Sequence, residues 1–150
     1  MFNKKAFTMI ELLIVISIIA ILAVAIVPNF IGFDKEARIA ATKSNLDTLR
    51  SRITLFRAKE SRYPANIGEL LTSSYIDAGV SKPYLNKIPP EMISNKSGNN
   101  TYVAQYSTEP LAGKGGWAYL VDKAEVVVDI VTPLDHSWGT EYVGQIPKDW

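Results

Sequence analysis

The feature that most constrains this chain is a long stretch without ionisable side chains, residues 12–33. Its inner part, residues 12–27, contains only Leu, Ile, Val and Ala apart from Ser17. As a helix the stretch would extend about 33 Å, close to the thickness of a bilayer core. Its apolar residues fall on every face, which suits a helix surrounded by apolar material. We therefore predict a membrane-spanning helix, and Lys4 and Lys5 before it predict a cytoplasmic amino terminus.

One acidic residue, Glu11, stands at the threshold of this stretch. A carboxylate beside hydrocarbon is unfavourable without a partner, so Glu11 is a candidate functional residue. Three interpretations are open. A secretory signal peptide requires a shorter apolar core followed by a small-x-small cleavage site. A plain membrane anchor fits the length but leaves Glu11 unexplained. A cut between Ala6 and Phe7 would keep the apolar run in the mature chain.

The sequence KKAFTMIELL at positions 4–13 carries a family resemblance. It is similar to the leader and first helix of type IV pilins and of type II secretion pseudopilins. It departs from their pattern in Ala6, where glycine is usual, and in Met9, where leucine is usual. Because alanine is also small, we expect cleavage to persist.

The resemblance implies a processing reaction and an assembly contact. A membrane prepilin peptidase would cleave between Ala6 and Phe7, and the new amino terminus on Phe7 would be methylated. Glu11 would then pair with the amino terminus of a neighbouring subunit. A carboxylate and an ammonium about 4 Å apart gain about 4 kcal/mol at an effective dielectric constant near 20. Leaving either charge unpaired among apolar helices costs a comparable amount.

Pro28 follows the apolar run and predicts a kink, because it removes one helical hydrogen bond. The helical pattern continues beyond it in an apolar stripe: Ile39, Leu46, Leu49, Ile53 and Phe56. We expect one helix over residues 8–62, bent near Pro28 and ending before the proline at position 64. The resemblance implies that part of residues 20–28 loses helical order on assembly.

The remaining sequence predicts a small head. Residues 63–100 are rich in Pro, Ser, Asn and Gly, which predicts a loop with one short helix at 67–73, capped by Asn66. Beyond it, the pattern alternates with a period of two in three predicted strands, residues 101–106, 117–121 and 125–131, with a further edge strand at 141–143. The predicted fold class is α+β: a long kinked amino-terminal helix packed on a small antiparallel sheet, as in the type IV pilin fold.

Five segments follow: a leader peptide (1–6), a transmembrane and filament-core half of the helix (7–33), an amphipathic half (34–62), a loop (63–100) and the sheet head with its carboxy-terminal loop (101–150).

A metal site in the head is a weaker prediction. The WG-x-x-Y stretch at 138–142 is similar to one in the major type II secretion pseudopilin, which binds calcium near its carboxy terminus. Asp122, Asp129 and Asp135 are candidate calcium ligands because they offer hard oxygens in this region. The chain has no cysteine, so a disulfide cannot close the carboxy-terminal loop. Packing of its tryptophans, or a metal, must do so.

Composition argues against several classes of function. With no cysteine and only His136 as a histidine, the chain offers no thiol nucleophile and no histidine cluster, so we do not expect an enzyme. A net charge of +1 gives no reason to expect nucleic-acid binding.

The expected function is that of a structural subunit, the major pilin of a type IV pilus-like extracellular filament. The alternative is the major pseudopilin of a type II secretion system, and a remote one is a membrane-anchored binding module. The expected partners are other copies in a helical homo-oligomer, the prepilin peptidase, an inner-membrane assembly platform and, before assembly, the membrane itself. The precursor would cross the inner membrane once with a cytoplasmic amino terminus, and the filament would be extracellular or periplasmic.

Overall fold

A computed structural model describes residues 7–94, 101, 103–107 and 110–150 of the chain. Within helix α1 (Met9–Glu60), the backbone is described throughout, but the side chains of residues 25 and 27–32 are not. The chain forms two compact units, Met1–Asp34 and Lys35–Trp150. The predicted leader, including Ala6, lies outside the described residues.

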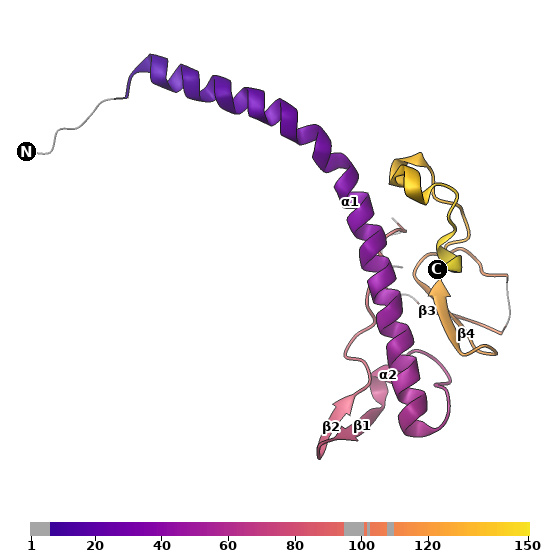
Figure 1. Cartoon of the computed structure of the whole chain (residues 1–150). Coiled ribbons are helices and arrows are strands. Elements are labelled where there is room, and N and C mark those ends of the chain that lie inside the picture. Colours follow the sequence, from indigo (N-terminus) through magenta and orange to yellow (C-terminus); the bar gives the residue numbers. More distant parts are fainter. Residues whose placement is uncertain (1–6, 95–100, 102, 108–109) are drawn as a thin grey trace, which may run out of the picture. The chain divides into compact units, whose positions relative to one another are not determined.

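The first unit consists, where described, of the first half of α1 (Figure 1). The helix assignment continues through Pro28, and the bend expected there stays a prediction. Apolar side chains of this half are exposed, from 44% for Val15 to 91% for Met9. The hydroxyl of Ser17 donates to the main-chain oxygen of Leu13 at 2.7 Å, so the helix itself satisfies this polar group. Among the residues whose side chains the structure describes, no helix is both long and apolar enough to cross a membrane.

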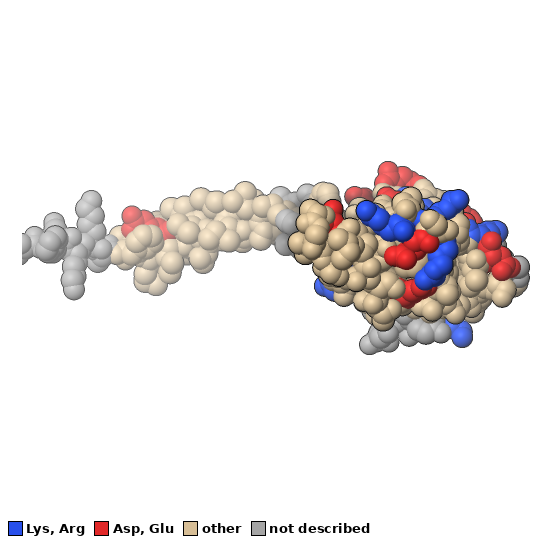
Figure 2. All heavy atoms as spheres, turned by 90° about the horizontal axis from the view of Figure 1, so that it is seen from below, with Lys and Arg blue, Asp and Glu red and all other residues tan. Residues whose placement is uncertain are grey.

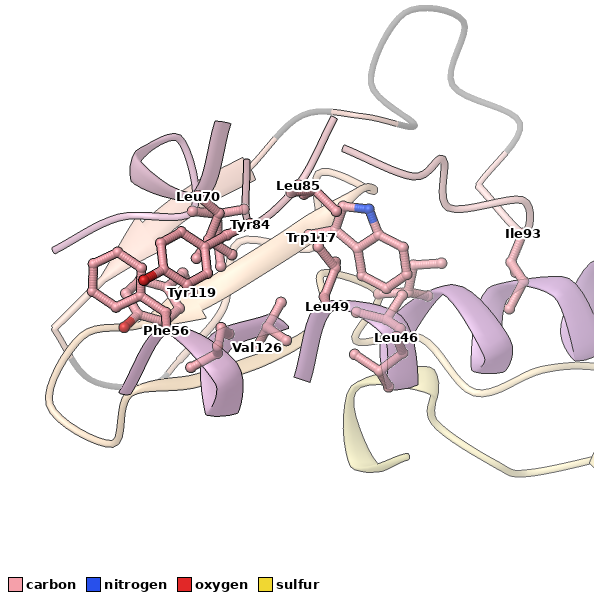
Figure 3. Packing of buried hydrophobic residues seen from close by; sticks show 14 of the residues in the cluster. Leu46, Leu49, Phe56, Leu70, Tyr84, Leu85, Ile93, Trp117, Tyr119 and Val126 are labelled. Carbon is pink, nitrogen blue, oxygen red and sulfur yellow. The ribbon is translucent and has the colours of Figure 1, made fainter. Parts of the chain in front are cut away.

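The second half of α1 carries the predicted apolar stripe, and all of its members are buried: Ile39, Leu46, Leu49, Ile53 and Phe56. They form one core with Trp117, Tyr119, Val126 and Val128 from the sheet (Figure 3). The helix ends where Ser61 adopts a left-handed φ of 58° and its N–H bonds to the Arg57 oxygen at 2.9 Å. Every member of the predicted apolar stripe therefore lies in the core.

A three-stranded sheet packs on this stripe in the order β3 (Val103–Tyr106), β4 (Trp117–Leu120), β5 (Glu125–Val128). Strands β4 and β5 form the predicted antiparallel hairpin. Strands β3 and β4 are parallel, so the sheet is mixed and the expected antiparallel pairing is present only between β4 and β5. The predicted α+β fold class, a long helix with a small sheet, is confirmed. The connection between β3 and β4 is long enough to return the chain to the starting end of β3. Three glycines with positive φ, Gly113, Gly115 and Gly116, turn it back.

The segment predicted as a loop contains an additional hairpin, which the sequence reading missed. A short helix α2 (Glu69–Thr72) leads into β1 (Ser74–Asp77) and β2 (Val80–Pro83), which pair antiparallel. The two-residue turn between them has left-handed φ at Ala78 (49°) and Gly79 (82°), as a tight hairpin requires. The helix expected at 67–73 is thus shortened to α2.

The carboxy-terminal segment forms three short 3-10 helices, His136–Trp138, Thr140–Tyr142 and Pro147–Asp149. The edge strand predicted at 141–143 is therefore wrong, since most of it lies in the second of these helices. The Lys35 Nζ atom lies 5.4 Å from the centroid of the Trp138 ring, and the Lys43 Nζ atom lies 4.4 Å from the centroid of the Trp150 ring. These contacts, together with packing on the core, hold the segment on α1 without a disulfide.

Candidate functional site: the amino end of the long helix

Thr8 and Glu11 form a reciprocal cap at the start of α1. The Glu11 Oε2 atom accepts hydrogen bonds from the Thr8 main-chain N–H (2.9 Å) and the Thr8 hydroxyl (2.8 Å). The Glu11 N–H donates in return to the Thr8 hydroxyl oxygen at 3.2 Å. This is a capping box, in which a Thr cap and a Glu three residues later satisfy main-chain donors at a helix end. The pattern T-x-x-E was present in the sequence, but the sequence reading did not use it.

The cap determines where the helix begins relative to the predicted cut. Phe7 lies outside the helix and is 71% exposed, and the first helical residue is Met9. Among the described residues, no hydrogen bond is made to the second carboxylate oxygen of Glu11, Oε1. A carboxylate can accept several hydrogen bonds, so this oxygen is available to a further donor. Of the other predicted site residues, Ala6 is not described, and Pro28 is described only in its backbone.

The predicted calcium ligands do not form one site. In the described part of the chain, no group of three or more His, Cys, Asp or Glu side chains is placed to hold a metal ion. Asp129 is fully buried and accepts from the N–H of Gly113 at 2.8 Å. Asp135 caps a 3-10 helix through Ser137, and hydrogen bonds from Ser137 lower the pKa of its carboxyl group. Asp122 is exposed in the turn after β4.

A second buried carboxylate, Glu91, was not recognised in the sequence. It is 1% exposed and accepts from the N–H of Ser94 at 2.8 Å and from that of Gly116 at 3.4 Å. The Ile93 N–H also donates to it. Glu91 therefore ties the loop after β2 to the start of β4, as Asp129 ties the glycine-rich connection to the end of β5. Both carboxylates organise loops.

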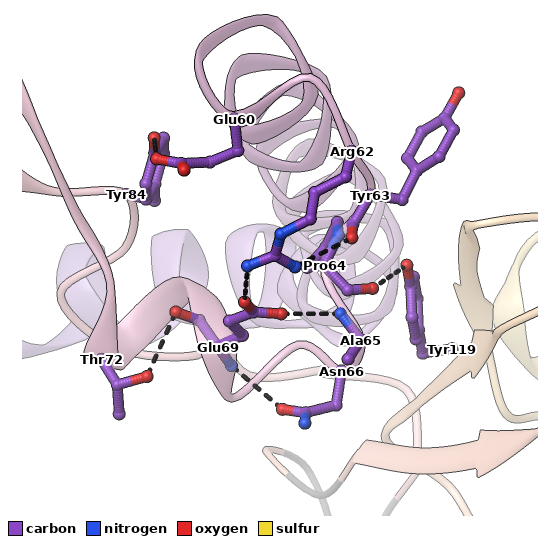
Figure 4. Close-up of polar contacts among 10 residues, drawn as sticks. All are labelled: Glu60, Arg62, Tyr63, Pro64, Ala65, Asn66, Glu69, Thr72, Tyr84 and Tyr119. Atoms are coloured by element: carbon purple, nitrogen blue, oxygen red, sulfur yellow. Dashed lines mark hydrogen bonds and ion pairs between the residues drawn. The ribbon is translucent and has the colours of Figure 1, made fainter.

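A polar network holds the chain where it leaves α1 (Figure 4). The Arg62 guanidinium pairs with Glu69, whose Oε2 also accepts from the Ala65 N–H at 2.7 Å. The Arg62 hydrogen bond lowers the pKa of the Glu69 carboxyl group. The predicted cap is present, since the Glu69 N–H donates to the Asn66 side chain at 3.0 Å.

Tyr84 adds a buried phenol beside this network. Its hydroxyl donates to Glu60 Oε1 at 2.7 Å. Burial, and secondly this hydrogen bond, raise the pKa of Tyr84 to about 12.

Comparison with known proteins identifies the amino-terminal region first. Residues 1–27 match the family described as the prokaryotic N-terminal methylation motif. The chain is 32% identical over 89 residues to the type II secretion system core protein G of Klebsiella michiganensis, covering 59% of this chain and 56% of that protein. It is 41% identical over 61 residues to the type IV major pilin protein PilA of Myxococcus xanthus, covering 41% of this chain and 28% of the pilin.

A third relative is the type IV wide pilus major component PilA4 of Thermus thermophilus, 36% identical over 70 residues, with 47% of this chain and 53% of that protein covered. The chain spans about half the length, or less, of these three relatives. No solved structure matches it.

Proposed function

We propose that this chain, a relative of type IV pilins and of type II secretion core protein G, is the major structural subunit of a type IV pilus-like filament. Its methylation motif and its relatives support this proposal. The relatives named above are pilins and a secretion-system core protein by name, and we assign no catalytic role to this chain.

One observation carries the proposal: the contrast between the two halves of α1. Beyond residue 38 the helix buries its apolar stripe against its own head. Before residue 27 its described apolar side chains are exposed on all sides, and Figure 2 shows an almost uncharged surface along it. An apolar surface of this extent requires a cover of lipid or of other apolar helices. In a membrane precursor, lipid would cover this surface. In a filament of packed copies, the helices of neighbouring copies would cover it.

Processing precedes assembly in this proposal. The prepilin peptidase cleaves between Ala6 and Phe7, Phe7 is methylated, and an inner-membrane platform adds the subunit to a growing helical homo-oligomer. The precursor crosses the inner membrane once, with its amino terminus in the cytoplasm. The exposed, non-helical position of Phe7 supports access to the cut, because a peptidase needs an extended substrate.

Glu11 has two separable roles. Its Oε2 atom caps its own helix through Thr8, and its charge is available to the ammonium of a neighbouring subunit through Oε1. The isolated subunit therefore does not hold a wholly unsatisfied carboxylate. Docking of a neighbouring subunit would therefore add an ion pair to a carboxylate that already accepts hydrogen bonds from Thr8 and is already oriented by them.

The experiment uses two substitutions in a strain without wild-type copies. Glu11→Ala removes both roles, whereas Glu11→Gln removes the charge and keeps a side chain that can complete a capping box. We expect mass spectrometry to find both variants cleaved before Phe7. We also expect both to be absent from sheared filaments. Normal filament assembly by Glu11→Gln would refute charge pairing.

The major pseudopilin of a type II secretion system is the second candidate function. It is favoured by the length of the match, because core protein G of Aeromonas hydrophila aligns with 72% of this chain, at 29% identity. The pilin matches above cover less than half of the chain. Deleting the gene distinguishes the two candidate functions. Loss of surface filaments with secretion intact indicates a pilin, whereas loss of secretion with surface filaments intact indicates a pseudopilin.

A further inference from the structure

The uncharged stretch at residues 12–33 determines where the membrane surface falls in the proposed precursor. As a helix, this stretch matches the thickness of a bilayer core, so the chain would leave the hydrocarbon close to residue 33. The headgroup layer beyond the core is about 5–8 Å thick, which corresponds to about three to five helical residues. Helix α1 is assigned continuously from Met9 to Glu60, so no linker precedes the head. The first turn of the head, residues 35–38, would therefore lie at the level of the headgroups.

The carboxy-terminal segment at residues 135–143 lies beside this first turn, although it is distant in the sequence. The Lys35 Nζ atom is 5.4 Å from the centroid of the Trp138 ring. Gly139 approaches the same turn so closely that a Cβ at its position would lie 3.7 Å from Glu36 Oε1. Its φ of 102° also favours glycine. Figure 1 shows the segment, in yellow, beside α1. These contacts hold the segment at the amino end of the head.

Trp138 and Tyr142 are the aromatic residues of this segment, and both are half-buried. Trp and Tyr are enriched at membrane interfaces, because an apolar ring that carries a polar group suits the boundary between acyl chains and headgroups. The indole N–H groups of Trp117 and Trp150 donate to acceptors within the chain. That of Trp138 has no hydrogen-bond partner among the described residues. It is therefore available to an oxygen outside the chain, and the Val143 side chain nearby is 39% exposed.

The charges at this end of the head are of both signs. The ammonium groups of Lys35 and Lys43 lie 5.4 Å and 5.5 Å from ring centroids of the segment. The carboxylates of Glu36, Asp135 and Glu141 belong to the same two parts of the chain. The described side chains thus form no basic patch of the kind that attracts anionic lipids. Mixed charge of this kind suits zwitterionic phospholipid headgroups.

We propose that residues 135–143 form an interfacial anchor, in which Trp138 and Tyr142 enter the headgroup layer of the non-cytoplasmic leaflet before assembly. A lipid surface is the occupant because the chain itself brings the membrane to this position. The uncharged stretch ends at residue 33, and Lys35, two residues later, already contacts the Trp138 ring. This inference rests on the proposed membrane precursor and adds a lipid contact made by the head. The anchor restricts rotation of the head, so each subunit meets the assembly platform in one orientation.

The first test measures how close the segment lies to the headgroups. Because the chain has no cysteine, a single cysteine can be introduced and labelled with a small fluorophore. Thr140→Cys and Val143→Cys place the label on the segment, at exposed positions. Asp122→Cys is the matched control, at an exposed position in the turn after β4.

The control position lies away from the amino end of the head. Strand β5 begins at Glu125, directly after the turn, and Glu125 pairs with Arg50 at 3.7 Å. Arg50 lies about 22 Å further along α1 than Lys35. This separation exceeds the thickness of the headgroup layer, so a label in the turn should stay clear of the lipid.

Each labelled full chain is reconstituted in vesicles of phosphatidylcholine and phosphatidylethanolamine, with or without a phospholipid that carries a nitroxide on its headgroup. A nitroxide quenches only fluorophores close to it. We expect loss of most of the fluorescence at positions 140 and 143 and little loss at position 122. Adding phosphatidylglycerol or salt should leave this pattern unchanged, because the anchor does not depend on net charge. Quenching that requires phosphatidylglycerol and disappears in salt would overturn the aromatic contact.

The second test asks whether the Trp138 ring is what enters the headgroup layer. Trp138→Ala should lose most of the quenching at position 140, whereas Trp138→Tyr, which keeps an interfacial ring, should retain it. Denaturant unfolding, followed by the fluorescence of the buried Trp117, shows whether the head of each variant is folded. Equal quenching in the two folded variants would overturn the role of the ring. If Trp138→Ala does not fold, the labels in the otherwise unsubstituted chain decide the question.

The outcomes separate this inference from the proposed function. A chain that fails to float with the vesicles would contradict the membrane precursor, and with it the proposed function. A chain that floats, but whose labels at positions 140 and 143 are quenched as little as the label at position 122, would overturn the anchor alone.

Discussion

Replacing Tyr84 by phenylalanine should make the variant less stable than the parent protein at neutral pH and more stable than it at alkaline pH. Tyr84 is 1% exposed, and its ring contacts those of Phe56 and Tyr75, with a centroid separation of 4.9 Å in both pairs. Its hydroxyl donates to Glu60 at 2.7 Å. Burial of the phenol, and then the nearby carboxylate, raise the pKa of Tyr84 from 10.0 to about 12.

The magnitude follows from the difference between the folded and unfolded pKa of this phenol. A difference of about two pH units corresponds to at most about 3 kcal/mol of unfolding free energy. The folded state favours the protonated phenol, so this contribution is fully present below pH 10.0 and is lost as the pH rises toward 12. At neutral pH, Tyr84→Phe loses one hydrogen bond to an exposed carboxylate, worth about 1 kcal/mol.

The variant is therefore expected to be about 1 kcal/mol less stable than the parent at neutral pH. Near pH 12 it should be the more stable of the two. Denaturant unfolding of the detergent-solubilised full chain at both pH values measures the reversal. The difference between the tyrosinate absorbance titrations of parent and variant isolates the Tyr84 phenol. Tyr63→Phe, at an exposed position, controls for the loss of one chromophore. A titration midpoint near 10 for Tyr84, or no reversal, would refute the reasoning.

Three further predictions concern the head. Glu69→Gln should cost about 1 kcal/mol at neutral pH. Because its bond to Arg62 lowers the pKa of Glu69, the parent should lose that advantage as the pH falls below 4.5, which acid titration of the unfolding free energy checks. Lys43→Ala removes the cation over Trp150 and should cost about 0.5–1 kcal/mol, seen as faster hydrogen exchange in the carboxy-terminal segment, with Lys43→Arg as the control. Phe56→Ala, at a fully buried position, should cost about 3–5 kcal/mol in denaturant unfolding.

The long helix could be predicted because its signal is local and repeated. The stripe from Ile39 to Phe56 keeps a helical period over five turns, and each of its members is buried. The β1–β2 hairpin carries a much weaker signal. Its strands have four residues each, and its turn places Ala78 in a left-handed conformation that alanine seldom adopts. Turn chemistry alone does not identify such a hairpin.

The parallel pairing of β3 with β4 could not be predicted for a different reason. Which strands pair depends on how the connection crosses, and strand-like sequence is the same in either direction. The structural role of the two buried carboxylates could not be predicted from the sequence either. Glu91 and Asp129 have partners distant in sequence, such as Gly116 and Gly113, so nothing in their local sequence distinguishes them from solvated acids.

Glu11 shows how a motif can identify the right residue and still leave its local chemistry unstated. The motif predicts a charge that awaits a partner, whereas the structure gives that carboxylate an immediate one in Thr8. The cap engages Oε2 and leaves the negative charge in place, because donation from a hydroxyl and an amide neutralises nothing. It also restricts the side chain to one orientation, so in the proposed assembly a neighbouring ammonium would meet an acceptor that needs little further ordering. If Glu11 pairs as proposed, the cap assists the pairing without replacing it. Thr8→Val, which keeps the shape and removes the hydroxyl, should then weaken assembly less than Glu11→Gln does.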